Sequence, residues 1–339
     1  MTWLTWRQHR IELLIMGLVL LLFASVLLAT GINITAFAQR VGFTGLIGCT
    51  EASACGQAWF AMNGYLSGLT QPPSAFYFIG LVAPFILPAL VGMFVGAPAL
   101  AREFEQGTHR LLWTQGIPWS RWFFRKTGLL IGVVACAFAL LFGFFSWWRA
   151  SLPTPLAQDA NWFFNAFAGR FDTWGVVSIA YAVFAVALGL LLGTLIRKPV
   201  PAMAITLVLF VVVRLLIANF WRPYYLPPVV VTTPMNANSG IPGDSWLVKT
   251  EYVDRGGQVF SANADIIQTC FSQPSQTSSV RCFTEHGIQQ RWVYQPKDRF
   301  WPMQGIESGI YLLFSALLVA LAFWWVKYRI IGKHIEMKQ

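Results

Sequence analysis

The sequence is poor in charged residues. Only 11% of its 339 residues are charged, and 56% are hydrophobic, whereas a soluble domain has about 25% charged and about 45–50% apolar residues. The polar surface that would dissolve a globular protein is therefore missing, which excludes a cytosolic enzyme, a disordered chain and a coiled coil. The composition predicts an integral membrane protein in direct contact with the lipid bilayer.

Residues suited to catalysis or metal binding are also scarce. The four histidines, at positions 9, 109, 286 and 334, are scattered, and none has a His or Cys partner at metal-ligand spacing. The sequence contains neither the Gly-x-Ser-x-Gly elbow of serine hydrolases nor a Gly-x4-Gly-Lys-Ser/Thr phosphate loop. We therefore expect no catalytic site, no metal site and no bound cofactor in this chain.

Long hydrophobic runs, by contrast, are abundant. A bilayer core about 30 Å thick requires roughly 20 apolar residues of helix. The predicted fold is all-α with six transmembrane helices, at Leu13–Thr35, Phe76–Ala101, Thr127–Trp148, Trp174–Ile196, Val200–Phe220 and Ile306–Val326. The first run is longer than the apolar region of a signal peptide, about 7–15 residues, so we expect it to be retained.

The distribution of basic residues predicts the orientation. If the N-terminus is cytoplasmic, the 53 residues of the inner segments (1–12, 102–126, 197–199 and 327–339) carry 13 of the 24 Lys and Arg. The 150 residues of the outer segments carry 10. Because Lys and Arg concentrate on the cytoplasmic side, we expect both termini in the cytoplasm. The net charge of +10 then reflects topology, so no nucleic-acid partner is expected.

Four of the five cysteines lie in the expected outer loops. Cys49 and Cys55 are close in the first loop, and Cys270 and Cys282 are close in the last, whereas Cys136 lies in the third span. This distribution predicts two disulfides in an oxidising exterior. Four unpaired thiols placed by chance are the alternative.

The outer segment 221–305 differs in composition from the rest. It combines seven basic and six acidic residues with many Ser, Gln, Thr and Pro. Its aromatic residues could form a small core: Trp246, Tyr252, Phe260, Phe271, Trp292 and Tyr294. We therefore expect a small folded extracellular domain between the fifth and sixth spans, followed by the sixth span (306–326) and a basic cytoplasmic tail (327–339).

Two spans contain residues that interrupt a helix or allow close contact between helices. The second holds three prolines, at 84, 88 and 98, which predict a kinked or broken helix. Pairs of glycines four residues apart, Gly92 with Gly96 and Gly189 with Gly193, allow helices to approach closely. That approach could occur within the subunit or in a dimer.

Arg214 is the ionisable residue that we identify inside a span, about six residues from the outer end of the fifth window. Intramembrane charges are costly and often functional. Arg214 either extends to the outer headgroups or lines a transport pathway. With so few charges in the spans, a proton-relay transporter is disfavoured.

Two inner segments have amphipathic patterns. Residues 1–12 place Trp3, Trp6, Arg7 and Arg10 at helical spacing, which predicts an interfacial helix or an ordinary flank of the first span. In the loop 102–126, one helical face would hold Phe104, Thr108, Leu111, Leu112 and Gln115. A helix ending near Gly116 would be too short and charged to cross the bilayer, so we expect it to lie along the membrane surface and contact a soluble partner.

These two segments resemble the membrane subunit of ABC-2 type ATP-driven exporters of actinobacteria and similar bacteria. The similar stretches are TWLTWRQHR at residues 2–10, EFEQGTHR at 103–110 and WTQG at 113–116, together with six spans. The resemblance implies an elbow helix at residues 2–12. It also implies a coupling helix that docks on a separate ATP-binding subunit, through Arg102, Glu103, Glu105, Thr108, Arg110 and Gln115.

The resemblance further implies two permease subunits in a homo- or heterodimer, in a bacterial cell membrane. ATP and Mg would be bound by the partner ATPase. The 85-residue outer insert departs from the family pattern, and the substrate cannot be read from the sequence. Two other functions stay open: a membrane-embedded sensor or scaffold with a ligand-binding extracellular domain, and a lipid-modifying enzyme, which the lack of acid, base or metal groups disfavours.

Overall fold

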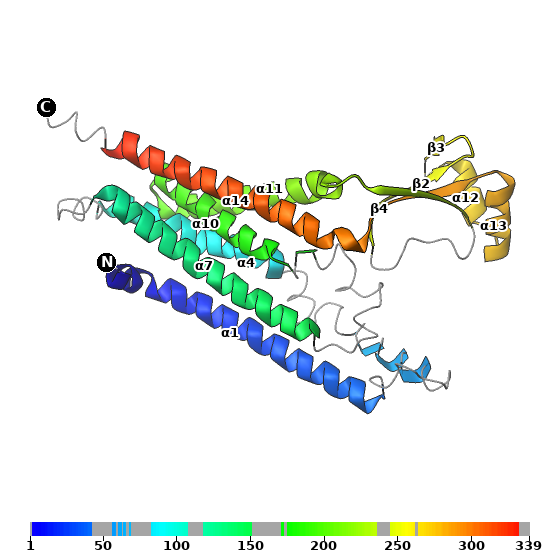
Figure 1. The fold of residues 1–339 in the computed structure, drawn as a ribbon, viewed down its shortest axis with the longest axis horizontal. Coiled ribbons are helices and arrows are strands. Elements are labelled where there is room, and N and C mark those ends of the chain that lie inside the picture. The colour runs from blue at the N-terminus through cyan, green and yellow to red at the C-terminus, as the bar shows by residue number, and fades with distance from the viewer. Residues whose placement is uncertain are drawn as a thin grey trace.

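The computed structural model describes residues 2–42, 56–58, 60–62, 64–65, 68, 83–107, 118–150, 171–172, 175–235, 245–261 and 264–331. Most of them form a bundle of long helices (Figure 1). The helical elements of the bundle are α1 (Thr2–Arg40), α4 (Ala83–Val91), η3 (Gly92–Gly96), α5 (Ala97–Gln106), α7 (Trp119–Ala150), α10 (Val177–Ile196), α11 (Pro199–Leu216), η4 (Ile217–Trp221), η5 (Arg222–Tyr224), α14 (Phe300–Trp325) and η7 (Val326–Ile331).

Among the described residues, six helical segments are long and apolar enough to cross a membrane, as the sequence predicted. They are Gly17–Arg40, Ile86–Gln106, Trp119–Trp148, Val177–Ile196, Pro199–Tyr224 and Lys297–Tyr328. The start of α1 and the end of η7 lie at one end of the bundle, and a sheet unit projects from the other (Figure 1). We call these the termini end and the sheet end.

The first and last spans differ from the predicted windows. Helix α1 is helical without a break from Thr2 to Arg40, so residues 2–12 are helical but form one element with the first span. Helix α14 begins at Phe300, six residues before the predicted start of the sixth span. The transmembrane part of the chain therefore reaches into the segment predicted to be an extracellular insert.

The second span is interrupted, as its prolines predicted. Helix α4 contains Pro88, the next five residues form the π-helical η3, and α5 restarts the α-helix with Pro98 in its first turn. Proline removes a backbone donor, and a π-helical turn takes up the resulting change in helix register. The interruption leaves η3 packed against the neighbouring helix α10.

Helix α10 is the centre of the bundle. It contacts α4, η3, α5, α7, α11 and α14, and most of its residues are buried. Both predicted glycine pairs lie on its interface with η3 and α5. A Cβ atom added at Gly189 would lie 2.5 Å from the backbone nitrogen of Ala97, and one at Gly193 would lie 2.4 Å from the Ala97 carbonyl oxygen. The glycine pairs therefore bring two backbones together within one subunit.

The sheet unit contains a four-stranded antiparallel sheet, which the all-α prediction did not include. The strands are β1 (Val229–Pro234), β2 (Trp246–Val253), β3 (Val259–Phe260) and β4 (Gln289–Gln295), in the order β1-β4-β2-β3. Between β3 and β4, α12 (Asp265–Phe271) and α13 (Gln276–Glu285) pack on the sheet. The register pairs Val231 with Trp292 and Thr250 with Trp292, so β4 is central.

The small core of this unit confirms a folded insert in part. Ile267, Cys270, Phe283 and Ile288 are buried, and the predicted residues Tyr252 and Phe260 pack against them. Trp246 instead packs on the core of the helical bundle. Phe271 is 51% exposed and lies at the edge of this core, with its ring 5.0 Å from that of Phe283.

Candidate functional site

Four charged side chains form a buried cluster at the sheet end of the bundle, which we call the charge cluster. It consists of Asp172, Arg214, Arg222 and Glu307, whose exposed fractions are 8%, 1%, 5% and 0%. Asp172 precedes α10, Arg214 is on α11, Arg222 begins η5 and Glu307 is in the second turn of α14. Two carboxylates and two guanidinium groups give the cluster a formal charge of zero.

Arg222 holds the cluster together. Its Nη2 and Nη1 donate to Oδ1 and Oδ2 of Asp172 at 2.8 and 3.2 Å. Its Nε and Nη2 donate to Oε2 and Oε1 of Glu307, both at 2.9 Å. The planar guanidinium of Arg222 thus forms bidentate hydrogen bonds with both carboxylates. Such bidentate pairs are strong and offset part of the free-energy cost of burying charge.

Arg214 and Tyr181 complete the arrangement. The guanidinium of Arg214 lies 3.0 Å from Oδ1 of Asp172 and 3.3 Å above the centre of the Tyr181 ring. The Tyr181 hydroxyl accepts a hydrogen bond from Arg222 at 3.0 Å. It also lies close enough to the carboxylates of Glu307 and Asp172 to donate a hydrogen bond to them. The interpretation that Arg214 extends to the headgroups is therefore wrong, since the residue is enclosed by its partners.

Exposed aromatic side chains place the charge cluster at the membrane boundary of the sheet end. Trp221, Tyr224 and Trp301 are 54%, 62% and 49% exposed, as is typical of side chains at the membrane interface. Arg214 precedes Trp221 by seven residues, on the order of 10 Å along the helix. Glu307 is six residues past Trp301. Arg214 and Glu307 are thus buried within spans, where a charge needs a partner, and Arg222 reaches them from the level of the aromatic side chains.

The same region attaches the sheet unit. The amide nitrogen of Gln295, at the end of β4, donates to the carbonyl oxygens of Pro223 at 3.0 Å and Leu226 at 2.7 Å. Arg299 donates to the Pro227 carbonyl and, at 3.0 Å, to Oε1 of Gln295. Together with the Arg222–Glu307 contact, these bonds join the two chain connections that enter and leave the sheet unit.

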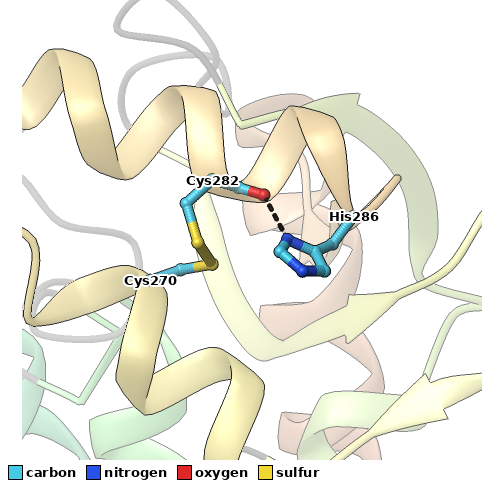
Figure 2. Close-up of side chains that lie close together, drawn as sticks. All are labelled: Cys270, Cys282 and His286. Atoms are coloured by element: carbon cyan, nitrogen blue, oxygen red, sulfur yellow. Dashed lines mark hydrogen bonds between the residues drawn. A yellow bond between two sulfur atoms is a disulfide. The ribbon is translucent and has the colours of Figure 1, made fainter.

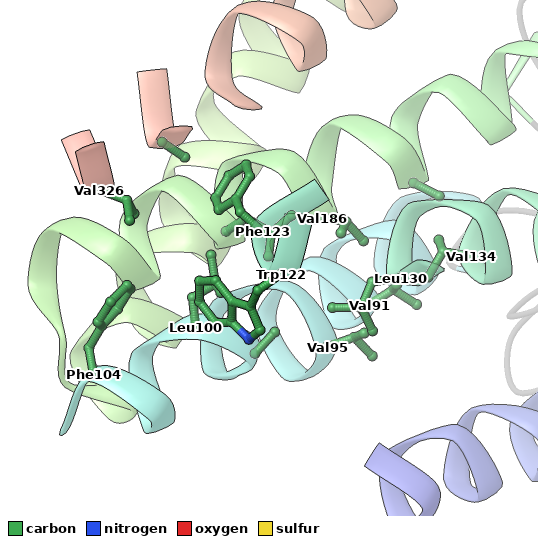
Figure 3. Close-up of a cluster of buried hydrophobic side chains, with 14 of the residues drawn as sticks. Val91, Val95, Leu100, Phe104, Trp122, Phe123, Leu130, Val134, Val186 and Val326 are labelled. Atoms are coloured by element: carbon green, nitrogen blue, oxygen red, sulfur yellow. The ribbon is translucent and has the colours of Figure 1, made fainter. Parts of the chain in front are cut away.

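A second polar feature lies at the termini end, where the chain leaves α5. Glu103 is buried, 6% exposed, and its carboxylate accepts a hydrogen bond from Lys126 of α7, which is 4% exposed. The same ends of α5, α7 and η7 contribute to a cluster of buried apolar side chains: Figure 3 shows Leu100, Phe104, Trp122, Phe123 and Val326. The ion pair therefore joins the last turn of α5 to the first turns of α7.

This geometry corrects the predicted coupling helix. Helix α5 ends at Gln106, and Gly107 has a φ of 68°, a left-handed conformation that terminates the helix. A single helix over Arg102–Gln115 is therefore wrong. Glu103 faces the interior, whereas Arg102 and Glu105 are exposed. Thr108, Arg110 and Gln115 lie outside the described residues.

The remaining predicted site residues are placed in part. Trp3, Trp6, Arg7 and Arg10 belong to α1, but their side chains lie outside the described part of the structure, and their role as interfacial anchors stays a prediction. Cys49 and Cys55 also lie outside it. Cys270 and Cys282 form the predicted disulfide between α12 and α13, with Cα atoms 5.4 Å apart.

The disulfide also accounts for a group of possible metal ligands. Atoms of Cys270, Cys282 and His286 lie within 4.8 Å of one another. The two sulfurs are bonded to each other, and Nδ1 of His286 donates to the carbonyl oxygen of Cys282 at 2.8 Å (Figure 2). Because cysteine binds a metal as the thiolate, the disulfide-bonded sulfurs of this group do not fit a metal ion.

The predicted site residues did not include three members of the charge cluster. Glu307 lies inside the predicted sixth window, so its charge alone could have identified it. Asp172 and Arg222 each lie two residues outside a predicted window, and no local pattern links them to Arg214. Their pairing depends on four separate elements that meet in space.

The comparison with protein families agrees with this architecture. The chain matches the family described as ABC-2 membrane transporter related over residues 17–222, more than half of its length. No curated protein and no solved structure gave a match. The matched segment holds the first five spans with Asp172, Tyr181, Arg214 and Arg222, and it ends before the sheet unit and α14. The chain belongs to the ABC-2 membrane transporter related family.

Proposed function

We propose that this multi-pass membrane protein is the permease subunit of an ATP-driven exporter in a bacterial cell membrane. Permeases of this family are generally non-catalytic membrane subunits. A separate ATP-binding subunit would hold ATP and Mg and supply the energy. A second permease subunit, identical or related, would complete the transporter.

The observation that carries this proposal is the last turn of α5 at the termini end. The exposed Arg102 and Glu105 stand on the last turn of α5, beside Glu103, which is locked to Lys126. A force applied to that turn would move α5 and, through the glycine contacts, α10. A surface turn with a rigid connection to the bundle suits a docking site for an ATPase.

Co-purification tests the partnership. A tagged full-length chain, solubilised gently from its own host, is expected to bring down an ATP-binding subunit in stoichiometric amount. If no ATP-binding subunit accompanies the chain under any gentle condition, the proposal is wrong. The membrane-embedded sensor would then be the better interpretation of the large sheet unit.

A charge reversal tests the docking site. Glu105→Lys is expected to reduce ATP-dependent transport at least about tenfold, because a like charge in an interface costs a few kcal/mol. Glu285→Lys is the matched control, since Glu285 is an exposed glutamate on α13 of the sheet unit. Transport that is unchanged by Glu105→Lys would exclude this turn as the contact.

Direction is tested with vesicles of both orientations. Export predicts that lipophilic test compounds accumulate in inside-out vesicles when ATP is added to the outside, and that a deletion strain is hypersensitive to the same compounds. Accumulation only in right-side-out vesicles energised from within would reverse the proposed direction.

A further inference from the structure

A groove on the lipid-facing side of the bundle runs between α7 and α14. It encloses about 490 Å³, and its lining includes Phe124 and Ile131 of α7, Val183 of α10, and Leu312, Val319 and Phe323 of α14. The one hydroxyl in the lining, on Ser315, donates to the carbonyl oxygen of Tyr311 and is satisfied. The walls are therefore apolar, which suits a hydrocarbon chain.

The length of the groove matches one leaflet of a bilayer. From Leu312 to Phe323 the wall of α14 spans eleven residues, about 16 Å of helix. Half of a hydrocarbon core of about 30 Å is about 15 Å. The groove thus extends from the middle of the membrane to its surface at the termini end, where the rings of Phe124 and Phe323 lie 5.0 Å apart.

A glycine leaves the groove open on the α7 side. Helix α7 carries Phe124, Gly128 and Ile131 at spacings of four and three residues. They therefore form one stripe along a single face of the helix. A Cβ atom at Gly128 would meet nothing within 4 Å. A large side chain at this position therefore has room, and on the face of Phe124 and Ile131 it would extend toward the groove.

Basic side chains stand at the surface end of the groove. Arg121 continues the stripe of Phe124 by one turn, and Lys327 follows Phe323 by four residues on α14 and η7. Both are exposed, as is Arg125 beside them. An apolar groove one leaflet long with cationic groups at headgroup level is complementary to an amphiphile with an anionic head.

From these features we propose that the groove binds an anionic phospholipid from the leaflet at the termini end. One acyl chain lies between α7 and α14, and the phosphate is held by Arg121 and Lys327. This proposal depends only on the groove and the basic side chains beside it. It is therefore independent of the proposed coupling to an ATPase and can be tested without any transport assay.

Lipid titration of the purified full-length chain, followed by native mass spectrometry, tests the site. Phosphatidylglycerol is expected to bind at least tenfold more tightly than phosphatidylcholine with the same acyl chains, because each basic residue near the headgroup contributes roughly a fivefold gain. The double variant Arg121→Gln/Lys327→Gln should lose that preference. Arg281→Gln, an exposed charge on α13, should keep it.

Groove-filling variants separate insertion of the acyl chain from simple charge attraction. Gly128→Leu should weaken binding of phosphatidylglycerol about tenfold or more. Gly143→Leu, at another open glycine of α7, should not. Ala320→Phe, on the opposite wall, should repeat the effect if Gly128→Leu folds poorly. Equal binding of the two lipids, or equal binding by the filled and control variants, overturns the proposal.

Discussion

The guanidinium of Arg222 and the carboxylate of Glu307 lie 2.9 Å apart, although 85 residues separate them in the chain. The whole sheet unit is inserted between these two residues. The contact therefore closes the insertion at its base and also balances two charges inside a transmembrane bundle.

Removal of one charge from this cluster should be strongly destabilising. Glu307→Gln leaves two guanidinium groups with one carboxylate, and breaking a buried pair in this way costs about 3–5 kcal/mol. We expect a clear fall in the free energy of unfolding, measured by denaturation in detergent. Arg281→Gln, which breaks the exposed pair with Glu285, should have no measurable effect.

A double variant distinguishes charge balance from loss of packing. Arg222→Leu combined with Glu307→Leu leaves Asp172 paired with Arg214 and restores a formal charge of zero. The double variant should therefore lose less stability than the sum of the two single variants. Strictly additive losses would show that balance within the charge cluster is unimportant.

The contact between α5 and α10 should tolerate no side chain at Gly189. Gly189→Ala places a Cβ atom 2.5 Å from backbone atoms that have no flexible end, so the helices must separate, at a cost of about 1–3 kcal/mol or more. Gly305→Ala, on α14, meets open space and should be neutral or slightly stabilising. The yield of monodisperse protein and the melting temperature measure both variants.

The disulfide between Cys270 and Cys282 should stabilise the sheet unit. Its ends are 12 residues apart, and closing a loop of this length contributes about 3 kcal/mol on the chain-entropy model. Reductant should lower the melting temperature of the wild-type chain. The double variant Cys270→Ser/Cys282→Ser should be less stable in oxidising buffer and respond less to reductant, whereas Cys136→Ser should match the wild type.

Acid should weaken the sheet at Glu251. The nearby Lys249, whose Nζ lies 2.6 Å from Oε1 of Glu251, lowers the pKa of this carboxyl below its ordinary value of 4.5. A lowered pKa means that the contact is fully present above about pH 4.5 and is lost as the pH falls through the lowered value. Melting temperatures between pH 7 and pH 3 should therefore fall less steeply for Glu251→Gln than for the wild type, and identical slopes would contradict this.

The amino-acid sequence by itself determined the six helices and the interruption of the second span, and it placed Cys270 and Cys282 at a spacing that allows a disulfide. Each follows from a local property: the length of an apolar run, proline in a helix, or two cysteines twelve residues apart. The six helices form whatever the rest of the chain does, because a bilayer forces every long apolar run into a helix.

Only the tertiary structure decided the partners of the charges. Arg214 meets an aspartate 42 residues earlier, and Glu103 turns inward to Lys126 although its spacing suited a surface helix. The sheet likewise depends on pairing between strands from distant parts of the insert. A buried charge takes whichever opposite charge the packed helices bring near it, and helix packing is a property of the whole chain that no local spacing encodes.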